Sequence, residues 1–104
     1  MSTSVSRQAG PDRFEITSDD RVAGFTQFVD NGDRRIFFHT EIGEEFGGQG
    51  LAGIVVEEAV NATRADGQTI VPVCPYVKKW LTTHPEHDDI TAQPTPADLA
   101  AVPN

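Results

Sequence analysis

The sequence predicts an α+β fold, in which one sheet and its helices form a mixed α/β layer. Three observations predict this class. β-rich runs occupy the first part of the chain, an amphipathic helical pattern follows near Gly50, and a β-branched run and a second helical pattern come after it. The expected order is therefore strand, strand, strand, helix, strand, helix, with one helix crossing over the sheet.

Three strands are expected before the first helix. Residues 14–17 and 22–30 alternate between two faces, as half-buried strands do. Asn31-Gly32-Asp33 supplies residues that tolerate a positive φ in a hairpin turn, and residues 34–42 continue as a β-rich run. These three runs predict an antiparallel three-stranded meander.

Two helices and a fourth strand are expected in the second half. Apolar residues recur every three or four positions from about Gly50 to Ala65, and Asp66-Gly67 is typical of a helix end. Residues 69–74 form a β-branched run whose proline predicts an edge or locally bent strand. A last helix is predicted from Pro75 to Leu81, with Pro85 as its stop.

The two ends of the chain are expected to be loose. Residues 1–12 are small and polar, and residues 91–104 contain three prolines and little bulk. The sequence therefore predicts one domain over residues 13–90, flanked by a flexible leader and a flexible tail. A chain of 104 residues has room for one modest core.

The charge and the cysteine content exclude several classes of protein. A formal net charge of -8, from 16 acidic and 8 basic residues, disfavours steering toward nucleic acid. No segment approaches the roughly 18 apolar residues that a membrane span needs, so we expect no membrane partner. The single cysteine, Cys74, allows no intrachain disulfide and predicts a cytoplasmic protein. The oligomeric state stays open.

Glycines cluster where the third predicted strand passes into the helix. The turn Gly47-Gly48-Gln49-Gly50-Leu51-Ala52 offers several backbone N–H groups to an anion, without side chains in the way. It is no P-loop, because no lysine follows the glycines. Gly48, Gly50 and Gly53 match a dinucleotide fingerprint by spacing alone, but no βαβ unit with an acidic partner follows. A flexible loop that merely begins a helix is the alternative interpretation.

Three sequence blocks occur in order along most of the chain: residues 39–42 (HTEI), 45–52 (EFGGQGLA) and 73–80 (VCPYVKKW). Together they resemble the signature blocks of the small YjdJ-type proteins of the GCN5-related N-acetyltransferase (GNAT) superfamily. The resemblance implies a minimal GNAT fold with a splayed fourth strand and a C-terminal helix, and acetyl-coenzyme A as the co-substrate. It also implies that backbone amides of residues 47–52 bind the cofactor diphosphate. Main-chain groups near residues 41–43, including Ile42, would face the acetyl carbonyl.

One position departs from the superfamily pattern [QR]-x-x-G-x-[GA]. Gly47 stands where that pattern has Arg or Gln, and Gln49 stands where relatives often carry another Arg. Losing charge-assisted bonds of roughly 1.5–3 kcal/mol each would weaken the affinity for the cofactor. The backbone cradle does not depend on these side chains.

Transfer of an acetyl group to an amine needs a base for the amine and an acid for the leaving thiolate. Strand alternation predicts Phe37, His39 and Glu41 on one face of the sheet, with Thr40 and Ile42 on the other. Glu41 is the preferred base and His39 the second choice. A histidine satisfied by hydrogen bonds within the sheet is the alternative for His39.

Two groups near the last helix complete the candidate catalytic set. Cys74 at a helix N-terminus could accept the acyl group as a thiolate, with a buried inert cysteine as the alternative. Tyr76 could protonate the leaving thiolate, although an aromatic residue in an amphipathic helix usually belongs to the core. Lys79, with Lys78 beside it, could meet the cofactor's 3′-phosphate or be solvated. Residues 84–89 contain ligand-type side chains without a zinc-type partner pair, so no metal is expected.

The sequence thus predicts an acetyl-coenzyme A-dependent N-acetyltransferase that acts on an unidentified small amine or protein amine. The alternative is a non-catalytic acyl-coenzyme A-binding or interaction module that keeps the fold. The chain is too short for the extra elements that build the acceptor pocket in larger relatives.

Overall fold

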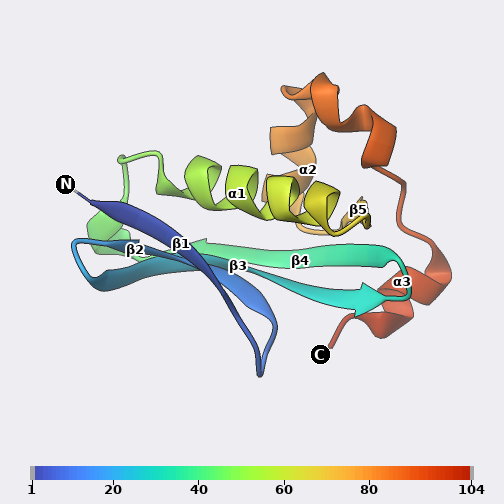
Figure 1. Cartoon of the computed structure of the whole chain (residues 1–104), viewed down its shortest axis with the longest axis horizontal. Helices are drawn as coiled ribbons and strands as arrows, with labels where there is room; N and C mark the ends of the chain where they lie inside the picture. Colours follow the sequence, from blue (N-terminus) through green and yellow to red (C-terminus); the bar gives the residue numbers. More distant parts are fainter. Residues whose placement is uncertain (1, 104) are drawn as a thin grey trace.

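A computed structural model describes residues 2–103 as one sheet with helices on both of its faces (Figure 1). The strands are β1 (Thr3–Gln8), β2 (Arg13–Ser18), β3 (Arg21–Asn31), β4 (Arg34–Ile42) and β5 (Thr69–Pro72). The helices are α1 (Leu51–Ala65), α2 (Pro75–Thr82) and α3 (Pro96–Ala101), with short 3₁₀ turns η1 (Glu44–Phe46) and η2 (Pro85–Ile90). No helix among residues 2–103 is long and apolar enough to cross a membrane.

The sheet has the order β1-β2-β3-β4-β5. Its first four strands are antiparallel, and β5 pairs in parallel with β4. Because parallel neighbours need a crossover connection, α1 runs between β4 and β5 across one face of the sheet (Figure 1). The α+β class, the antiparallel meander and the crossover helix are therefore confirmed.

The structure differs from the sequence prediction at both ends of the chain. Residues 3–8, expected as a loose leader, form β1 and pair with β2 along their whole length. β1 escaped prediction because its one large apolar side chain, Val5, gives no alternation to detect. Near the C-terminus, Thr95 and Asp98 form a capping box that begins α3. The sheet therefore has five strands instead of the expected four.

The core lies between α1 and the sheet. Its helix side consists of Leu51, Val55, Val56, Ala59 and Val60, all buried. Its sheet side consists of Phe14, Ile16, Phe28, Phe37 and Ile70. Burying one such large side chain stabilises the fold by about 1.5–3 kcal/mol. The apolar stripe thus fixes α1 over the sheet and sets where its N-terminus lies.

A β-bulge in β4 reverses the predicted faces of this strand. Phe28 lies opposite Phe37, but Gln27 lies opposite His39, so Phe38 is an extra residue without a partner. Phe37 therefore faces α1, with its ring 5.8 Å from that of Phe28. His39 shares the other face with Phe25, at a ring separation of 5.7 Å.

The prediction that Phe37 shares a face with His39 and Glu41 is therefore wrong. Thr40 and Ile42 lie on the α1 side of the sheet, together with Phe37. Strict alternation could not show this, because a single inserted residue changes the side on which every later side chain stands.

β4 and β5 separate after a short parallel pairing. The pairing covers residues 34–37 of β4 and 69–72 of β5. The N–H groups of Val73 and Cys74 both donate to the carbonyl oxygen of Phe37, at 3.0 and 2.8 Å. From His39 to Ile42, β4 then has no partner strand on this side among the described residues. The splayed fourth strand is present: after Phe37 the main chain of β4 diverges from that of residues 73–76, and we call this divergence at the edge of β4 the slot.

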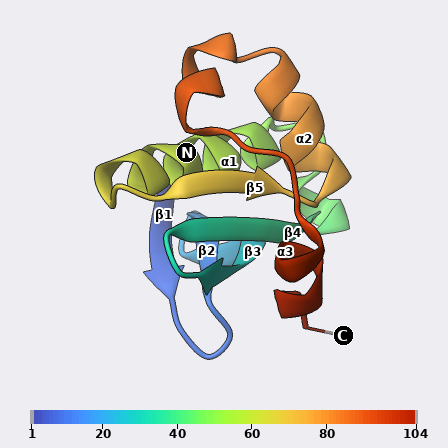
Figure 2. The same cartoon turned by 90° about the vertical axis from the view of Figure 1, so that its right-hand side faces the viewer.

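The C-terminal segment passes from one face of the sheet to the other (Figure 2). Ala92 N–H donates to Ile70 O at 2.9 Å along the outer side of β5, and α3 then lies beneath the sheet. Asp98 of α3 is fully buried and receives hydrogen bonds from Arg34 Nε and Nη2, at 3.0 and 2.8 Å. This pair fixes the end of the chain to β4.

The buried carboxylate of Asp98 makes stability depend on acid. The hydrogen bonds from Arg34 hold the pKa of Asp98 well below its ordinary value. Because the folded pKa is lowered, the stabilisation is complete above the unfolded pKa of about 3.9 and is lost as the pH falls further. We expect Asp98→Asn to be less stable at pH 7 and to lose less stability than the wild type on going below pH 4. Chemical unfolding at several pH values measures this. Exposed Asp20→Asn should keep the wild-type slope; an equally steep slope in Asp98→Asn would contradict the assignment.

Candidate functional site

The glycine turn forms a short, exposed path from the sheet into α1. η1 follows β4 and is anchored by the buried ring of Phe46. Gly48 and Gly50 have φ values of 79° and 73°, which glycine adopts without steric cost. Gly50 is the N-cap of α1, and no side chain caps the helix. The predicted turn is therefore present, and its glycines are required by its backbone angles.

The amides of this turn are free to meet a ligand. Gly47 N–H donates to Glu44 O at 3.1 Å, so this predicted contact is used within the protein. The N–H groups of residues 48–53 have no acceptor among residues 2–103. Unpaired amides and the positive end of the helix dipole attract an anion at this point. The turn is thus a candidate anion site in an acidic protein.

The predicted cofactor residues in the turn differ in their surroundings. Gln49 is exposed, while the Leu51 side chain packs into the core and leaves only its main chain toward the turn. Ala52 and Ile42 are half-buried. Gly43 N–H donates to Ala23 O at 2.8 Å, so this amide is not available as the oxyanion-type donor that the resemblance implied.

A row of small polar groups borders the slot on the α1 side. Cys74 is 5% exposed, and its thiol donates to Thr40 Oγ1 at 3.5 Å. Thr40 Oγ1 lies 3.0 Å from Oγ1 of the fully buried Thr26. Sequence reasoning missed both threonines. The sequence gives little indication of either residue, because threonine is common in strands. The contact of Thr40 with Cys74 also depends on the bulge, which the sequence does not reveal.

His39 and Glu41 lie on the opposite face of the sheet from Cys74. Their side chains are exposed, and His39 Nε2 is 3.2 Å from Glu41 Oε1. The four predicted catalytic residues therefore do not converge on one face. His39 and Glu41 stand on one side of the sheet and Cys74 on the other, with the slot at the edge of β4 between them.

Tyr76 and Lys79 lie on α2 beside the start of α1. Together with Trp80 and Thr83 they line a cavity of about 270 Å³. The Tyr76 side chain, 41% exposed, is not part of the core. Lys78 lines a different cavity of about 170 Å³, next to Pro72, so the two lysines serve different surfaces.

The ligand-type residues at 84–89 have structural partners. His84 Nδ1 lies 2.7 Å from Trp80 O, and the His84 ring stacks on the Trp80 ring at 3.7 Å. His87 Nδ1 meets Arg64 Nη2 at 3.3 Å. Arg64 also pairs with Asp89 and lowers the pKa of that carboxyl through its hydrogen bonds. Within residues 2–103 no group of three or more His, Cys, Asp or Glu is arranged to hold a metal ion.

Comparison with known proteins identifies the family of this fold. Residues 13–90 match the model of the GCN5-related N-acetyl-transferase family. A GCN5-like protein of Staphylococcus aureus, solved by NMR, superimposes with a TM-score of 0.67 over 89% of this chain and 91% of that chain. The two sequences are 19% identical, so this likeness concerns the fold. No curated protein sequence matches the chain significantly.

Proposed function

The chain belongs to the GCN5-related N-acetyltransferase family, and we propose that it binds acetyl-coenzyme A and transfers the acetyl group to an amine. The observation that carries this proposal is the run of unpaired amides at residues 48–53, next to the slot between β4 and α2. Membership of the YjdJ-type subfamily is part of the proposal and rests on residues 39–42, 45–52 and 73–80. The single cysteine supports a cytoplasmic location.

In this proposal the cofactor diphosphate binds to the amides of residues 48–53, with Lys79 close to its nucleotide end. The N–H groups of residues 48–53 are already oriented toward the ligand, so they can bind an anion although the protein as a whole is negatively charged. The unpaired edge of β4 from His39 to Ile42 then offers main-chain groups to the pantetheine arm, which supplies the activated acetyl group. Because position 47 has no Arg or Gln side chain, the affinity for the cofactor depends on the backbone amides and on neighbouring side chains.

Chemistry in this proposal takes place at the edge of β4. Glu41, supported by His39 at 3.2 Å, accepts the proton of the amine as its nitrogen bonds to the acetyl carbon. The carbon–sulfur bond breaks, and Tyr76 is the candidate donor of a proton to the departing thiolate. Cys74 is the alternative acyl acceptor, although its thiol is nearly buried against Thr40. An exposed carboxylate in a protein of charge -8 favours a cationic amine as the acceptor.

Replacing Glu41 with Gln tests the assigned base. We expect the acetylation rate to fall about a hundredfold, because a positioned base contributes roughly that factor or more. The affinity for acetyl-coenzyme A should be unchanged by calorimetry, since Glu41 lies on the opposite face from α1. Mass spectrometry of a panel of amines measures the rate, with Glu57→Gln on the outer face of α1 as the matched control. Equal rates for Glu41→Gln and the control would remove Glu41 from this role.

A non-catalytic acyl-coenzyme A-binding module is the second candidate, and Gly47 in place of Arg or Gln favours it. Calorimetry and mass spectrometry on the same sample separate the two functions. Binding with transfer of acetyl groups supports the enzymatic function. Binding without transfer to any amine or to Cys74 supports the non-catalytic binding module. If acetyl-coenzyme A does not bind, both are rejected.

A further inference from the structure

The cavity on α2 faces the first turn of α1 at a single glycine. Gly53 is the third residue of α1. A Cβ atom built on Gly53 would lie 3.8 Å from the Tyr76 hydroxyl oxygen and 4.0 Å from Trp80 Nε1. The polar tips of both aromatic residues therefore flank the open side of Gly53, within the stretch of unpaired amides.

Neither aromatic tip has a hydrogen-bond acceptor among the described residues. The Trp80 indole N–H can only donate, and a half-buried indole usually finds a partner. The Tyr76 hydroxyl has no partner either, and the ammonium of Lys79 in the same cavity forms no ion pair within residues 2–103. Donors on α2 thus face donors on α1 across a small gap. An anion is the kind of ligand that satisfies both sets.

The indole is held in place before any ligand arrives. The His84 ring stacks on it at 3.7 Å with an interplanar angle of 7°. His84 is itself fixed through Nδ1, which lies 2.7 Å from Trp80 O and 3.0 Å from Thr83 Oγ1. Because the ring is already ordered, an acceptor at Nε1 would bind without a large loss of side-chain freedom.

We propose that Trp80 donates a hydrogen bond from α2 to the same diphosphate that the amides of residues 48–53 hold from α1. This inference rests on the proposed function and adds a second side to its anion site. Trp80 then replaces the side-chain donor that the family pattern places at position 47. Gly53 is needed because it keeps the gap between the two helices free of a side chain.

The chain contains one tryptophan, so its fluorescence reports on this contact directly. We expect coenzyme A and inorganic pyrophosphate to change the emission of Trp80, and pantetheine, which lacks the diphosphate, to leave it unchanged. Calorimetry on the same samples measures binding independently of the fluorescence. If coenzyme A binds by calorimetry and the emission stays constant, the inference is overturned and the proposed function stands.

Substitutions give a second readout. Trp80→Phe keeps a ring but removes the N–H, and we expect the affinity for coenzyme A and for pyrophosphate to fall about tenfold, as loss of a charge-assisted bond does. Gly53→Ala keeps Trp80 and favours the helical conformation, so it should raise the melting temperature. Because the new methyl group fills the gap between the helices, it should also lower the affinity for both ligands. Thr82→Ala, which lies on α2 but outside this cavity, is the matched control and should keep the wild-type affinity for both ligands.

The outcomes distinguish this inference from the function on which it rests. Wild-type affinity for both ligands in folded Trp80→Phe and in Gly53→Ala would overturn the role of Trp80 without touching acetyl-coenzyme A binding. If the wild type binds pyrophosphate with a change in emission but not coenzyme A, the two-sided anion site stands and the proposed function fails.

Discussion

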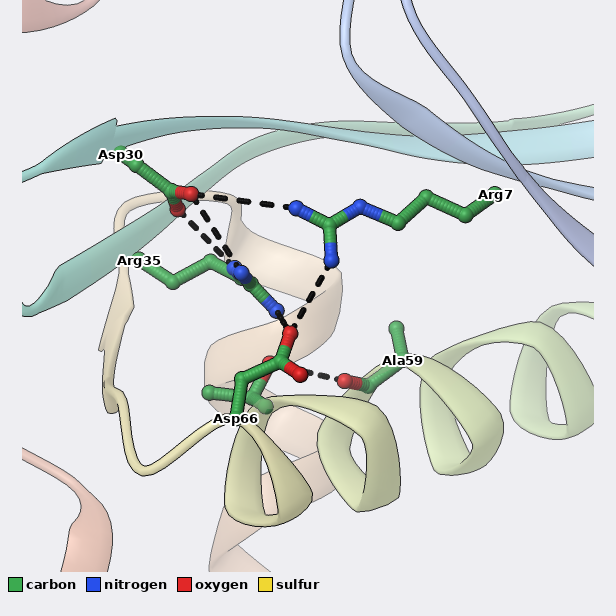
Figure 3. A network of polar contacts seen from close by, with 6 residues as sticks. Arg7, Asp30, Arg35, Ala59 and Asp66 are labelled. Atoms are coloured by element: carbon green, nitrogen blue, oxygen red, sulfur yellow. Dashed lines mark hydrogen bonds and ion pairs between the residues drawn. The ribbon is translucent and has the colours of Figure 1, made fainter.

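Arg35→Ala is expected to lower the free energy of unfolding by about 3 kcal/mol, because it removes a buried guanidinium and its charge-assisted hydrogen bonds to two carboxylates, worth about 1.5–3 kcal/mol each. Arg35 is 1% exposed, and Figure 3 shows it between two carboxylates. Its Nε donates to Asp30 Oδ1 and its Nη1 to Asp66 Oδ2, both at 2.9 Å. Urea unfolding monitored by circular dichroism measures the loss.

Arg35 has this effect because it joins three parts of the fold. Asp30 is the next-to-last residue of β3, Asp66 follows α1, and Arg35 comes from β4 (Figure 3). Its guanidinium also stands 4.9 Å from the centre of the Phe28 ring, where a cation is attracted to the π face. The same hydrogen bonds lower the pKa of Asp66, so its carboxylate stays charged in mild acid. Without Arg35 the end of α1 loses its connection to the centre of the sheet.

Arg7→Ala is the matched control for this network. Arg7 reaches Asp66 Oδ2 at 3.0 Å, but its side chain is half exposed, so we expect a loss of no more than about 1 kcal/mol. If Arg35→Ala and Arg7→Ala cost the same, the buried network does not hold α1 to the sheet as argued.

Gly24→Ala is expected to cost about 3 kcal/mol or more, because the new methyl group has no room beside β4. A Cβ atom at this position would stand 2.3 Å from Glu41 O and 2.9 Å from Ile42 Cα. Backbone cannot move aside as a flexible side chain does. The end of β4 would have to shift, and the slot lies at this end.

Stability and function should therefore fall together in Gly24→Ala. Chemical unfolding measures the first, and calorimetry with acetyl-coenzyme A measures the second. Gly32→Ala is the control, because nothing lies within 4 Å of its Cβ position and only a positive φ of 64° opposes alanine. That strain costs about 1–2 kcal/mol. A Gly24→Ala protein as stable as this control would show that β4 is not packed against Gly24 as described.

Local sequence signals predicted most of the elements. The meander, the crossover helix and the last helix each follow from an apolar period or a turn residue, and each was found within a few positions. β1 gave no such signal because it is polar and pairs through its backbone with only Val5 against the core. The bulge at Phe38 gave none either, since an unpaired residue becomes visible only when two strands are aligned.

The candidate site was predictable to the same extent. The glycine turn was predicted because glycines mark positive φ values, which the structure has at Gly48 and Gly50. Trp80 was not found, because its position opposite Gly53 results from how two helices pack. The separation of Cys74 from Glu41 also required the three-dimensional register of β4.

The unpartnered Phe38 lets one strand serve two different environments. Before Phe38, packing against the core determines which side chains of β4 face α1. After Phe38, His39 and Glu41 face solvent, while Thr40 and Ile42 face α1. If β4 kept Phe38 but paired with β3 without the bulge, strict alternation would point Glu41 beneath α1, where an unpaired charge is costly, and would turn Thr40 away from the thiol of Cys74. The bulge thus keeps the hydroxyl and thiol groups on the α1 side of the sheet and the ionisable side chains of His39 and Glu41 on the solvent side.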